Sequence, residues 1–173
     1  MKISNTGDLL WKKFITDGDE NSISDLQITP DGGVLFSGET KAGYGRSSLS
    51  RNFIVRLNDY GEILWQKNFR GTGYKSFALQ SGPWTYFAGT SRFRKETGTD
   101  FWLIQMDNAG NILWQKSYGG RLSENLESLS IFKSGNILAA GNSRSFTVPD
   151  NFNAPLLLNI NERGDLVGIN ERV

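Results

Sequence analysis

A glycine followed four residues later by a tryptophan recurs along the chain, and this recurrence constrains the fold more than any other feature. It stands at Gly7 and Trp11, at Gly61 and Trp65, at Gly110 and Trp114, and a further copy opens at Gly164 with Gly168 in place of the tryptophan. The copies are roughly 50 residues apart, and self-similarity at such a period is the signature of a repeat architecture. The chain is therefore expected to stack several copies of one small unit.

Each copy contains three more apolar or alternating runs between turn residues. The second run reaches a glycine in every copy, at Gly38, Gly89 and Gly141. Such a glycine indicates either a close backbone approach or a positive φ. The remaining runs cover residues 24–29, 76–80 and 126–131 before that glycine, and 53–57, 102–106 and 156–160 after it. No segment has a helical period, so the sequence predicts four short strands per copy and an all-β fold.

Four strands per repeat are typical of a β-propeller blade. We expect one repeat domain over residues 1–173, with repeats at approximately 7–60, 61–109 and 110–163, and residues 164–173 starting a further strand. Propellers close with 4 to 8 blades, so three repeats would be half of a six-bladed ring or a fragment of a larger propeller. A β-trefoil, which also has three four-stranded repeats but closes alone, is the alternative fold.

The segments 110–120 and 99–107, together with Asp31-Gly32-Gly33, Gly38 and Thr40, resemble the repeats of bacterial β-propeller proteins. That resemblance covers nearly the whole chain and implies an exported protein, periplasmic or extracellular, if the chain is a fragment of such a protein. The glycine-to-tryptophan interval also looks like the tryptophan-docking motif of quinoprotein-like propellers, although Asp107 lies one residue closer to Gly110 than in that motif. These motifs specify an architecture rather than an activity.

The composition excludes several classes of function. The chain has no cysteine and no histidine, which removes disulfides, thiolate chemistry, imidazole metal sites and serine–histidine catalysis. A net charge of +1 argues against nucleic acid as a partner. No apolar stretch is long enough to span a membrane, and residues 1–5 lack the apolar core of a signal peptide, which leaves the compartment open. The acidic segment 17–21 lacks a full set of calcium ligands, so we expect no metal and no cofactor.

Basic residues gather in the predicted loops after the glycine-containing run. They are Lys41, Arg46, Arg51, Arg92, Arg94, Lys95 and Arg144. Equivalent loops of a propeller emerge on one rim, so these charges form a candidate ligand-binding surface for a protein or an anionic glycan. Because Trp11, Trp65 and Trp114 share one repeat position, we expect them, with Gly38, Gly89 and Gly141, to be structural residues at the contacts between repeats.

The sequence favours a non-enzymatic scaffold or interaction module that binds a protein or glycan partner through its loops. Two alternatives stay open, namely a carbohydrate-binding β-trefoil lectin and a carboxylate-based propeller glycosidase, which would need paired acidic residues at equivalent strand starts. Three repeats also leave two open edges, and residues 3–10 repeat as 160–167. We therefore expect a homodimer or a continuation of the repeats in a larger chain.

Overall fold

The computed structural model describes residues 1–15, 20–42, 49–70, 72–91, 98–146 and 152–168. These residues form strands and turns, and among them there is no helix that could cross a membrane. The strands are β1 (Lys2–Ile3), β2 (Leu9–Trp11), β3 (Glu20–Ile28), β4 (Val34–Ala42), β5 (Leu49–Leu57), β6 (Ile63–Arg70), β7 (Thr72–Ser81), β8 (Trp84–Ser91), β9 (Asp100–Met106), β10 (Ile112–Tyr118), β11 (Glu124–Ile131), β12 (Ile137–Ser143) and β13 (Ala154–Ile160). The prediction of an all-β fold is confirmed.

Antiparallel pairing between chain neighbours gathers these strands into four units. The N-terminal hairpin is β1–β2, sheet I is β3-β4-β5-β6, sheet II is β7-β8-β9-β10, and sheet III is β11-β12-β13. Each sheet begins one strand later than the corresponding sequence repeat, because the strand that opens a repeat pairs with the last strand of the preceding repeat. β6 and β10, which carry Trp65 and Trp114, are the fourth strands of sheets I and II.

Tight turns between the two strands explain this pairing with the preceding repeat. Between β5 and β6 the Gly61 amide donates to the Asn58 carbonyl over 3.1 Å, and the Asn58 amide donates to the Glu62 carbonyl over 3.0 Å. Gly61 has φ of 78°, as the left-handed position of such a turn requires. The glycine that opens each repeat thus closes a hairpin with the preceding strand. Gly7, Gly110 and Gly164, which open the other copies of the repeat, have positive φ as well.

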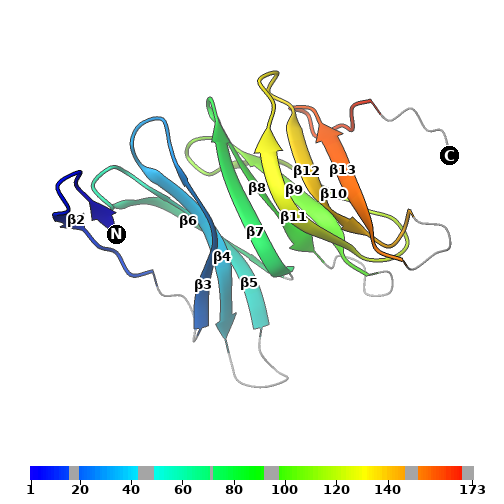
Figure 1. The fold of residues 1–173 in the computed structure, drawn as a ribbon, viewed down its shortest axis with the longest axis horizontal. Helices are drawn as coiled ribbons and strands as arrows, with labels where there is room; N and C mark the ends of the chain where they lie inside the picture. The colour runs from blue at the N-terminus through cyan, green and yellow to red at the C-terminus, as the bar shows by residue number, and fades with distance from the viewer. Residues whose placement is uncertain (16–19, 43–48, 71, 92–97, 147–151, 169–173) are drawn as a thin grey trace.

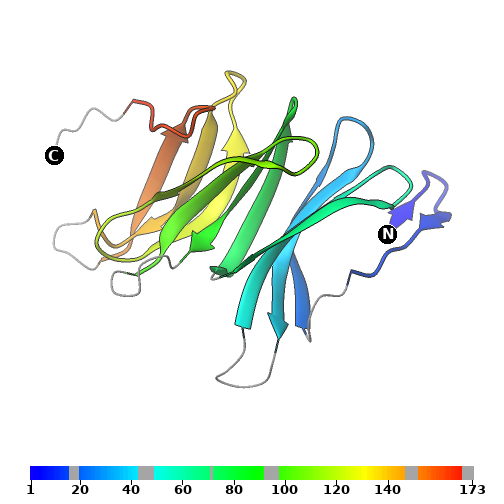
Figure 2. The same cartoon turned by 180° about the vertical axis from the view of Figure 1, so that it is seen from behind.

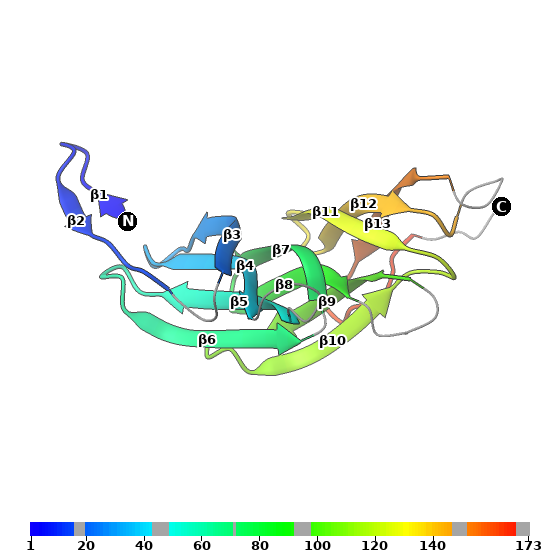
Figure 3. The ribbon, with the colours of Figure 1, turned by 90° about the horizontal axis from the view of Figure 1, so that it is seen from below.

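The sheets stand side by side along a curved row, with the N-terminal hairpin at one end and sheet III at the other (Figure 1). Seen from below, β3, β7 and β11 lie on the concave side of the row and β6 and β10 on the convex side (Figure 3). Figure 2 views the molecule from that convex side. The first strand of each following sheet packs on the sheet before it, as β7 does on β3, β4 and β5.

Apolar side chains fill the spaces between neighbouring units. Strands β4 and β5 are buried on both faces, so their side chains alternate between two layers. Val34, Phe36, Phe53, Val55 and Leu57 face the N-terminal hairpin. Leu35, Ile54, Phe69, Ala78, Phe87, Trp102, Ile104 and Met106 form the layer between sheets I and II. Tyr86, Phe101, Leu103, Tyr118, Leu126, Leu129, Ile137, Leu158 and Ile160 belong to the layer between sheets II and III.

Of the two roles predicted for the glycine in the second apolar run of each copy, Gly38 and Gly141 serve a close backbone approach and do not have a positive φ. Gly38 lies opposite Ile23, where β3 carries a bulge, and a Cβ at Gly38 would collide with the Ser22 carbonyl oxygen. Gly141 faces a bulge in β11 in the same way, against the Asn125 carbonyl. The strands do not end at these glycines, because β4 continues to Ala42 and β12 to Ser143.

Candidate functional site

The repeated tryptophans lie at the contacts between neighbouring units. Each indole Nε1–H donates to a backbone carbonyl in the turn that closes the following sheet. The acceptors are Asp59 for Trp11 at 2.9 Å, Asn108 for Trp65 at 2.8 Å and Glu162 for Trp114 at 2.9 Å. A buried indole N–H needs such an acceptor, and here it fixes one unit against the next.

The glycine that opens the next repeat makes room for each indole ring. A Cβ at Gly61 would lie 2.7 Å from Cδ2 of Trp11, and one at Gly110 would lie 2.9 Å from Cδ2 of Trp65. A Cβ at Gly164 would likewise lie 3.1 Å from Cζ3 of Trp114. The sequence spacing therefore connects two repeats: the tryptophan of one copy contacts the glycine of the next.

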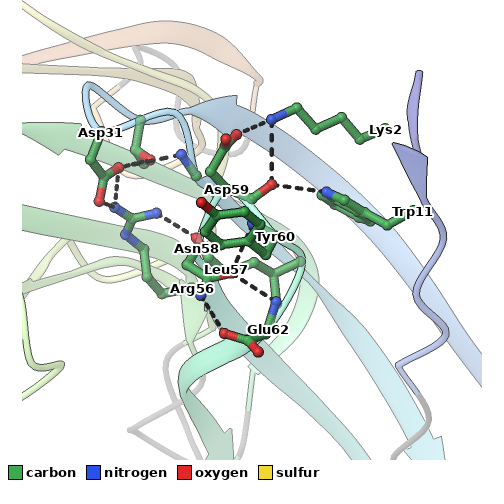
Figure 4. A network of polar contacts seen from close by, with 11 residues as sticks. Lys2, Trp11, Asp31, Arg56, Leu57, Asn58, Asp59, Tyr60 and Glu62 are labelled. Carbon is green, nitrogen blue, oxygen red and sulfur yellow. Dashed lines mark hydrogen bonds and ion pairs between the residues drawn. The ribbon is translucent and has the colours of Figure 1, made fainter. Parts of the chain in front are cut away.

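Polar contacts reinforce the first of these junctions (Figure 4). Lys2 forms an ion pair with Asp59, whose backbone carbonyl also accepts from Trp11. Asn58 Oδ1 accepts from the Glu62 amide over 2.9 Å, and its amide group donates to the Glu62 carboxylate over 2.7 Å. These contacts order the turn between β5 and β6 on which the hairpin rests.

A buried guanidinium lies next to that turn. Arg56 is 5% exposed, and its Nη2 donates to both carboxylate oxygens of Asp31 over 2.6 and 2.7 Å. Its Nη1 donates to the Leu57 carbonyl over 2.7 Å. Hydrogen bonds from Arg56, and then from the Thr29 hydroxyl, hold the pKa of Asp31 well below its usual range. The pair stabilises the turn between β3 and β4 against β5, which is a structural task.

Three of the basic residues proposed from sequence, Lys41, Arg51 and Arg144, lie at one end of the sheets. Lys41 is exposed near the end of β4, and Arg51 is half-buried in β5, where it pairs with Thr40 across the strands. Arg144 is exposed just after β12, and its backbone amide donates to the Ser123 carbonyl over 3.0 Å. Arg46, Arg92, Arg94 and Lys95 lie outside the described residues, as does the acidic segment 17–19.

Two carboxylates that the sequence analysis missed meet at the same end. Asp100 opens β9 and Glu124 opens β11, and a Cβ at Gly119 would collide with both carboxylates. Glu124 is fully buried, and its oxygens accept from the Ser143 hydroxyl over 2.7 Å and from the Gly120 amide over 3.0 Å. One oxygen of Glu124 thus orders the β10–β11 connection at Gly120, and the other holds the end of β12 at Ser143. Asp100 and Glu124 belong to different repeats and are separated in the chain, so no sequence motif contains both.

An apolar cavity of about 590 Å³ lies between the N-terminal hairpin and sheet I. Its walls include Trp11, Phe14 and Ile15 on one side and Val34, Phe36, Phe53 and Leu57 on the other. Ile23, Leu26 and Ile28 of β3 also line it, although they are 62%, 55% and 64% exposed. We call the surface formed by these three residues and the cavity the open face of sheet I.

The other sheets show what normally covers such a surface. The register against Gly38, Gly89 and Gly141 makes Ile23 equivalent to Ser76 and Leu126, and Leu26 equivalent to Ala78 and Leu129. The exposed fractions of these counterparts are 0%, 2%, 0% and 8%, respectively. They are buried because a preceding sheet packs on them, whereas no sheet precedes sheet I among the described residues. The open face is therefore an unoccupied contact between sheets.

Comparisons with known proteins give little further information about the site. No protein-family model matches the chain, and no curated protein matches it. A solved structure of a mannose phosphorylase from Leishmania mexicana, in complex with phosphate ion, is similar with a TM-score of 0.48 and 11% sequence identity. The similarity covers 90% of this chain and 46% of that enzyme, so the chain spans less than half of its length. At this level the likeness identifies neither a family nor an activity.

Proposed function

We propose that the chain is a non-enzymatic scaffold, an arc of a β-propeller, that functions by binding another folded polypeptide at the open face of sheet I. The observation that carries the proposal is the exposure of Ile23 and Leu26, whose counterparts in the following sheets are buried, together with that of Ile28 on the same strand. Contiguous exposed apolar surface on a folded protein marks an interaction site. The cavity beneath it gives a partner a depression into which it can insert side chains.

Three features support a propeller rather than a trefoil. The paired strands stay within separate up-and-down sheets of the described chain, and the sheets do not merge into one barrel. The first strand of each sheet lies on the concave side, as the inner strands of a propeller do (Figure 3). The indole contacts of Trp11, Trp65 and Trp114 recur with the same partner positions, so each sheet meets the next in the same way.

A scaffold also agrees with the state of the acidic residues. A glycosidase would need an accessible pair of carboxyl groups, one to protonate the leaving group and one to act as nucleophile or base. Glu124 instead has 0% exposure and accepts hydrogen bonds from Ser143 and Gly120. These contacts favour a structural task for Glu124 over a catalytic one.

The binding proposal is tested with two lysine substitutions on the surface. Ile28→Lys places a charge on the open face, while Leu113→Lys changes a residue on β10 that is 48% exposed on the convex side. Light scattering of the pure chain, and affinity capture from an extract of the source cells, then report self-association and binding of other proteins. We expect association to be lost in I28K and retained in L113K. Equal behaviour of the two variants, or no association at all, would contradict the proposal.

A second candidate function is the binding of an anionic glycan at the end of the sheets where β4 and β12 finish. It rests on Lys41, Arg51 and Arg144, which lie at the same end of sheets I and III. The double variant K41E/R144E should elute from a sulfated-glycan column at lower salt than the wild type, because fewer charges contact the glycan. Lys133→Glu, in the turn at the other end of sheet III, is the control and should elute unchanged. Equal elution of all three proteins would remove this candidate.

A further inference from the structure

The N-terminal hairpin stands where the outer edge of a further sheet would be, and the described residues include no inner strands for such a sheet. Trp11 and Ile15 pack against the face of sheet I formed by Val34, Phe36 and Phe53. Ile15 stands four residues after Trp11, as Phe69 does after Trp65 and Tyr118 after Trp114, and these last two pack against the following sheet in the same way. Residues 9–15 thus occupy the place of a fourth strand, and the cavity lies where strands one to three would be.

Sheet III has the complementary deficiency. Among the described residues it has three strands, and the edge of β13 is met there by one isolated bridge, between Ile160 and Leu166. In sheets I and II the corresponding edge is fully paired, from Leu57 and Ile63 to Arg51 and Arg70 in sheet I. Within the described residues, the N-terminal hairpin is thus placed like a fourth strand, and sheet III is described with three strands.

The outward face of sheet III also matches the open face of sheet I in chemistry. Leu157 is 63% exposed, whereas its register equivalents Ile54 and Leu103 are 0% and 2% exposed. Those two residues are covered by the first strand of the following sheet, the position that β3 holds in sheet I. Leu157 on one molecule and Ile23, Leu26 and Ile28 on another are thus the two halves of the contact that already joins sheets I, II and III.

The turn between β1 and β2 gives independent support. It has the backbone bonds of the later turns, with the Gly7 amide donating to the Ser4 carbonyl over 3.1 Å and φ of 91° at Gly7. Among the described residues no atom lies within 4 Å of a Cβ built at Gly7, where Gly61 and Gly110 would meet an indole. This turn is an indole-binding position without its tryptophan.

We propose that the partner at the open face is sheet III of a second copy of this chain, with residues 9–15 of the first copy adding to the edge of β13 as its fourth strand. Residues 3–10 of the first copy then take the positions that residues 160–167 occupy in the second, which the repetition between these segments permits. The Trp114 indole of the second copy then donates to the turn at Gly7 in place of the Glu162 carbonyl of its own chain. Because each copy has both halves, two contacts of this kind close a ring of six sheets. This inference rests on the proposed function and specifies its partner.

The register of the new pairing follows from the existing sheets. Ile54 faces Lys67 in sheet I, and Leu103 faces Lys116 in sheet II. The same rule places Lys13 of one copy opposite Leu157 of the other. Directly opposed residues of antiparallel strands are close enough for a disulfide, and the natural chain contains no cysteine.

Cysteine substitution therefore tests the inference directly. The variant K13C/L157C, oxidised after purification, should form a covalent dimer, because β2 and β13 lie at opposite ends of the arc and cannot meet within one chain (Figure 1). The matched control K12C/L157C is one residue out of register, with the first cysteine on the other face of the strand, and should not form this dimer. Equal cross-linking of the two variants, or none in the first, would overturn the pairing.

The mass in solution provides the second measurement. Sedimentation of the wild type should give twice the 19.3 kDa chain mass. Ile28→Lys should raise the dissociation constant about tenfold or more, since one charge buried against apolar surface costs at least the equivalent free energy, and L113K should leave it unchanged. A monomeric wild type would overturn the inference. If that monomer still captured another protein through Ile28, the proposed function would stand with a different partner.

Discussion

At the scale of single residues, the fold depends on polar groups that are satisfied at particular backbone positions. Arg56 shows this most clearly, because its buried guanidinium is neutralised by Asp31, whose side chain is 61% exposed. Solvent at that carboxylate screens the attraction, while the Arg56 side chain is only 6% exposed. Removing the carboxylate therefore leaves a buried charge with fewer partners.

We predict that Asp31→Asn lowers the free energy of unfolding by about 1–2 kcal/mol at pH 6, the range for a hydrogen bond to a charged group after screening. The pKa of Asp31 is depressed in the folded state by Arg56, so its stabilisation is complete above the unfolded pKa of about 4 and is lost as the pH falls towards the folded value. Urea unfolding of both proteins at pH 6 and at lower pH measures this. The difference between them should shrink below about pH 4, and a difference that grows on acidification would contradict the assignment.

The indole contacts allow a second prediction at this scale. Trp65→Ala removes both the ring that lies against Gly110 and the hydrogen bond to the Asn108 carbonyl, so we expect a loss of about 3 kcal/mol. Trp65→Phe keeps an aromatic ring and loses the donor, and should cost about 1 kcal/mol. Denaturant unfolding with a common slope checks both values. Equal stability of the two variants would show that the hydrogen bond, not packing, carries the contact.

At the scale of elements, the turns that join the last strand of one repeat to the first of the next determine how sheets meet. Their glycines have positive φ, but only those beside an indole also have no room for a Cβ. Gly135, in the turn between β11 and β12 of sheet III, offers a comparison, because its φ of 89° is close to the 79° of Gly110. A Cβ would lie 2.9 Å from Trp65 at Gly110 and within 4 Å of no described atom at Gly135. Comparing substitutions at these two glycines therefore separates the cost of backbone strain from the cost of disturbing the contact between sheets.

We predict that Gly135→Ala costs about 1 kcal/mol, the strain of a left-handed residue with a side chain. Gly110→Ala should cost about 2–4 kcal/mol, because the same strain is joined by displacement of the Trp65 ring. Thermal unfolding by near-ultraviolet circular dichroism reports the stability and the tryptophan environment together. If the two variants unfold at the same temperature with the same spectrum, the glycine has no part in the contact between sheets.

At the scale of the whole molecule, the main contacts among the described strands join each sheet to its neighbours along the row. Stability in such an arrangement is a sum of units and their interfaces, so the unit covered on both sides is the most stable. Sheet II holds this position, with Phe87, Ile104 and Met106 buried against sheet I and Tyr86 and Leu103 buried against sheet III. The two ends of the row have one interface each.

Hydrogen exchange should follow this order. Amides of β8 and β9 should exchange slowest, and those of β3 and β13 should exchange faster because no further sheet of the described chain covers the outer face of either strand. Raising the protein concentration should slow exchange in β3 and β13 selectively if a second copy covers them. Uniform protection across all sheets at low concentration would contradict this picture of stacked units.

The sequence alone determined the strand content, the period of the repeats and the turns, because local patterns carry this information: alternating apolar runs, and glycines where the backbone needs a left-handed residue or a close approach. The equivalence of Trp11, Trp65 and Trp114 was visible for the same reason. Only the tertiary structure decided that β6 and β10 pair backwards into the preceding sheet, since pairing partners are separated in the chain. Likewise, Asp100 and Glu124 meet only through the packing of sheets II and III. Whether Ile23 and Leu26 are core or surface depended on which sheet precedes them, and this contact is not encoded by their own segment.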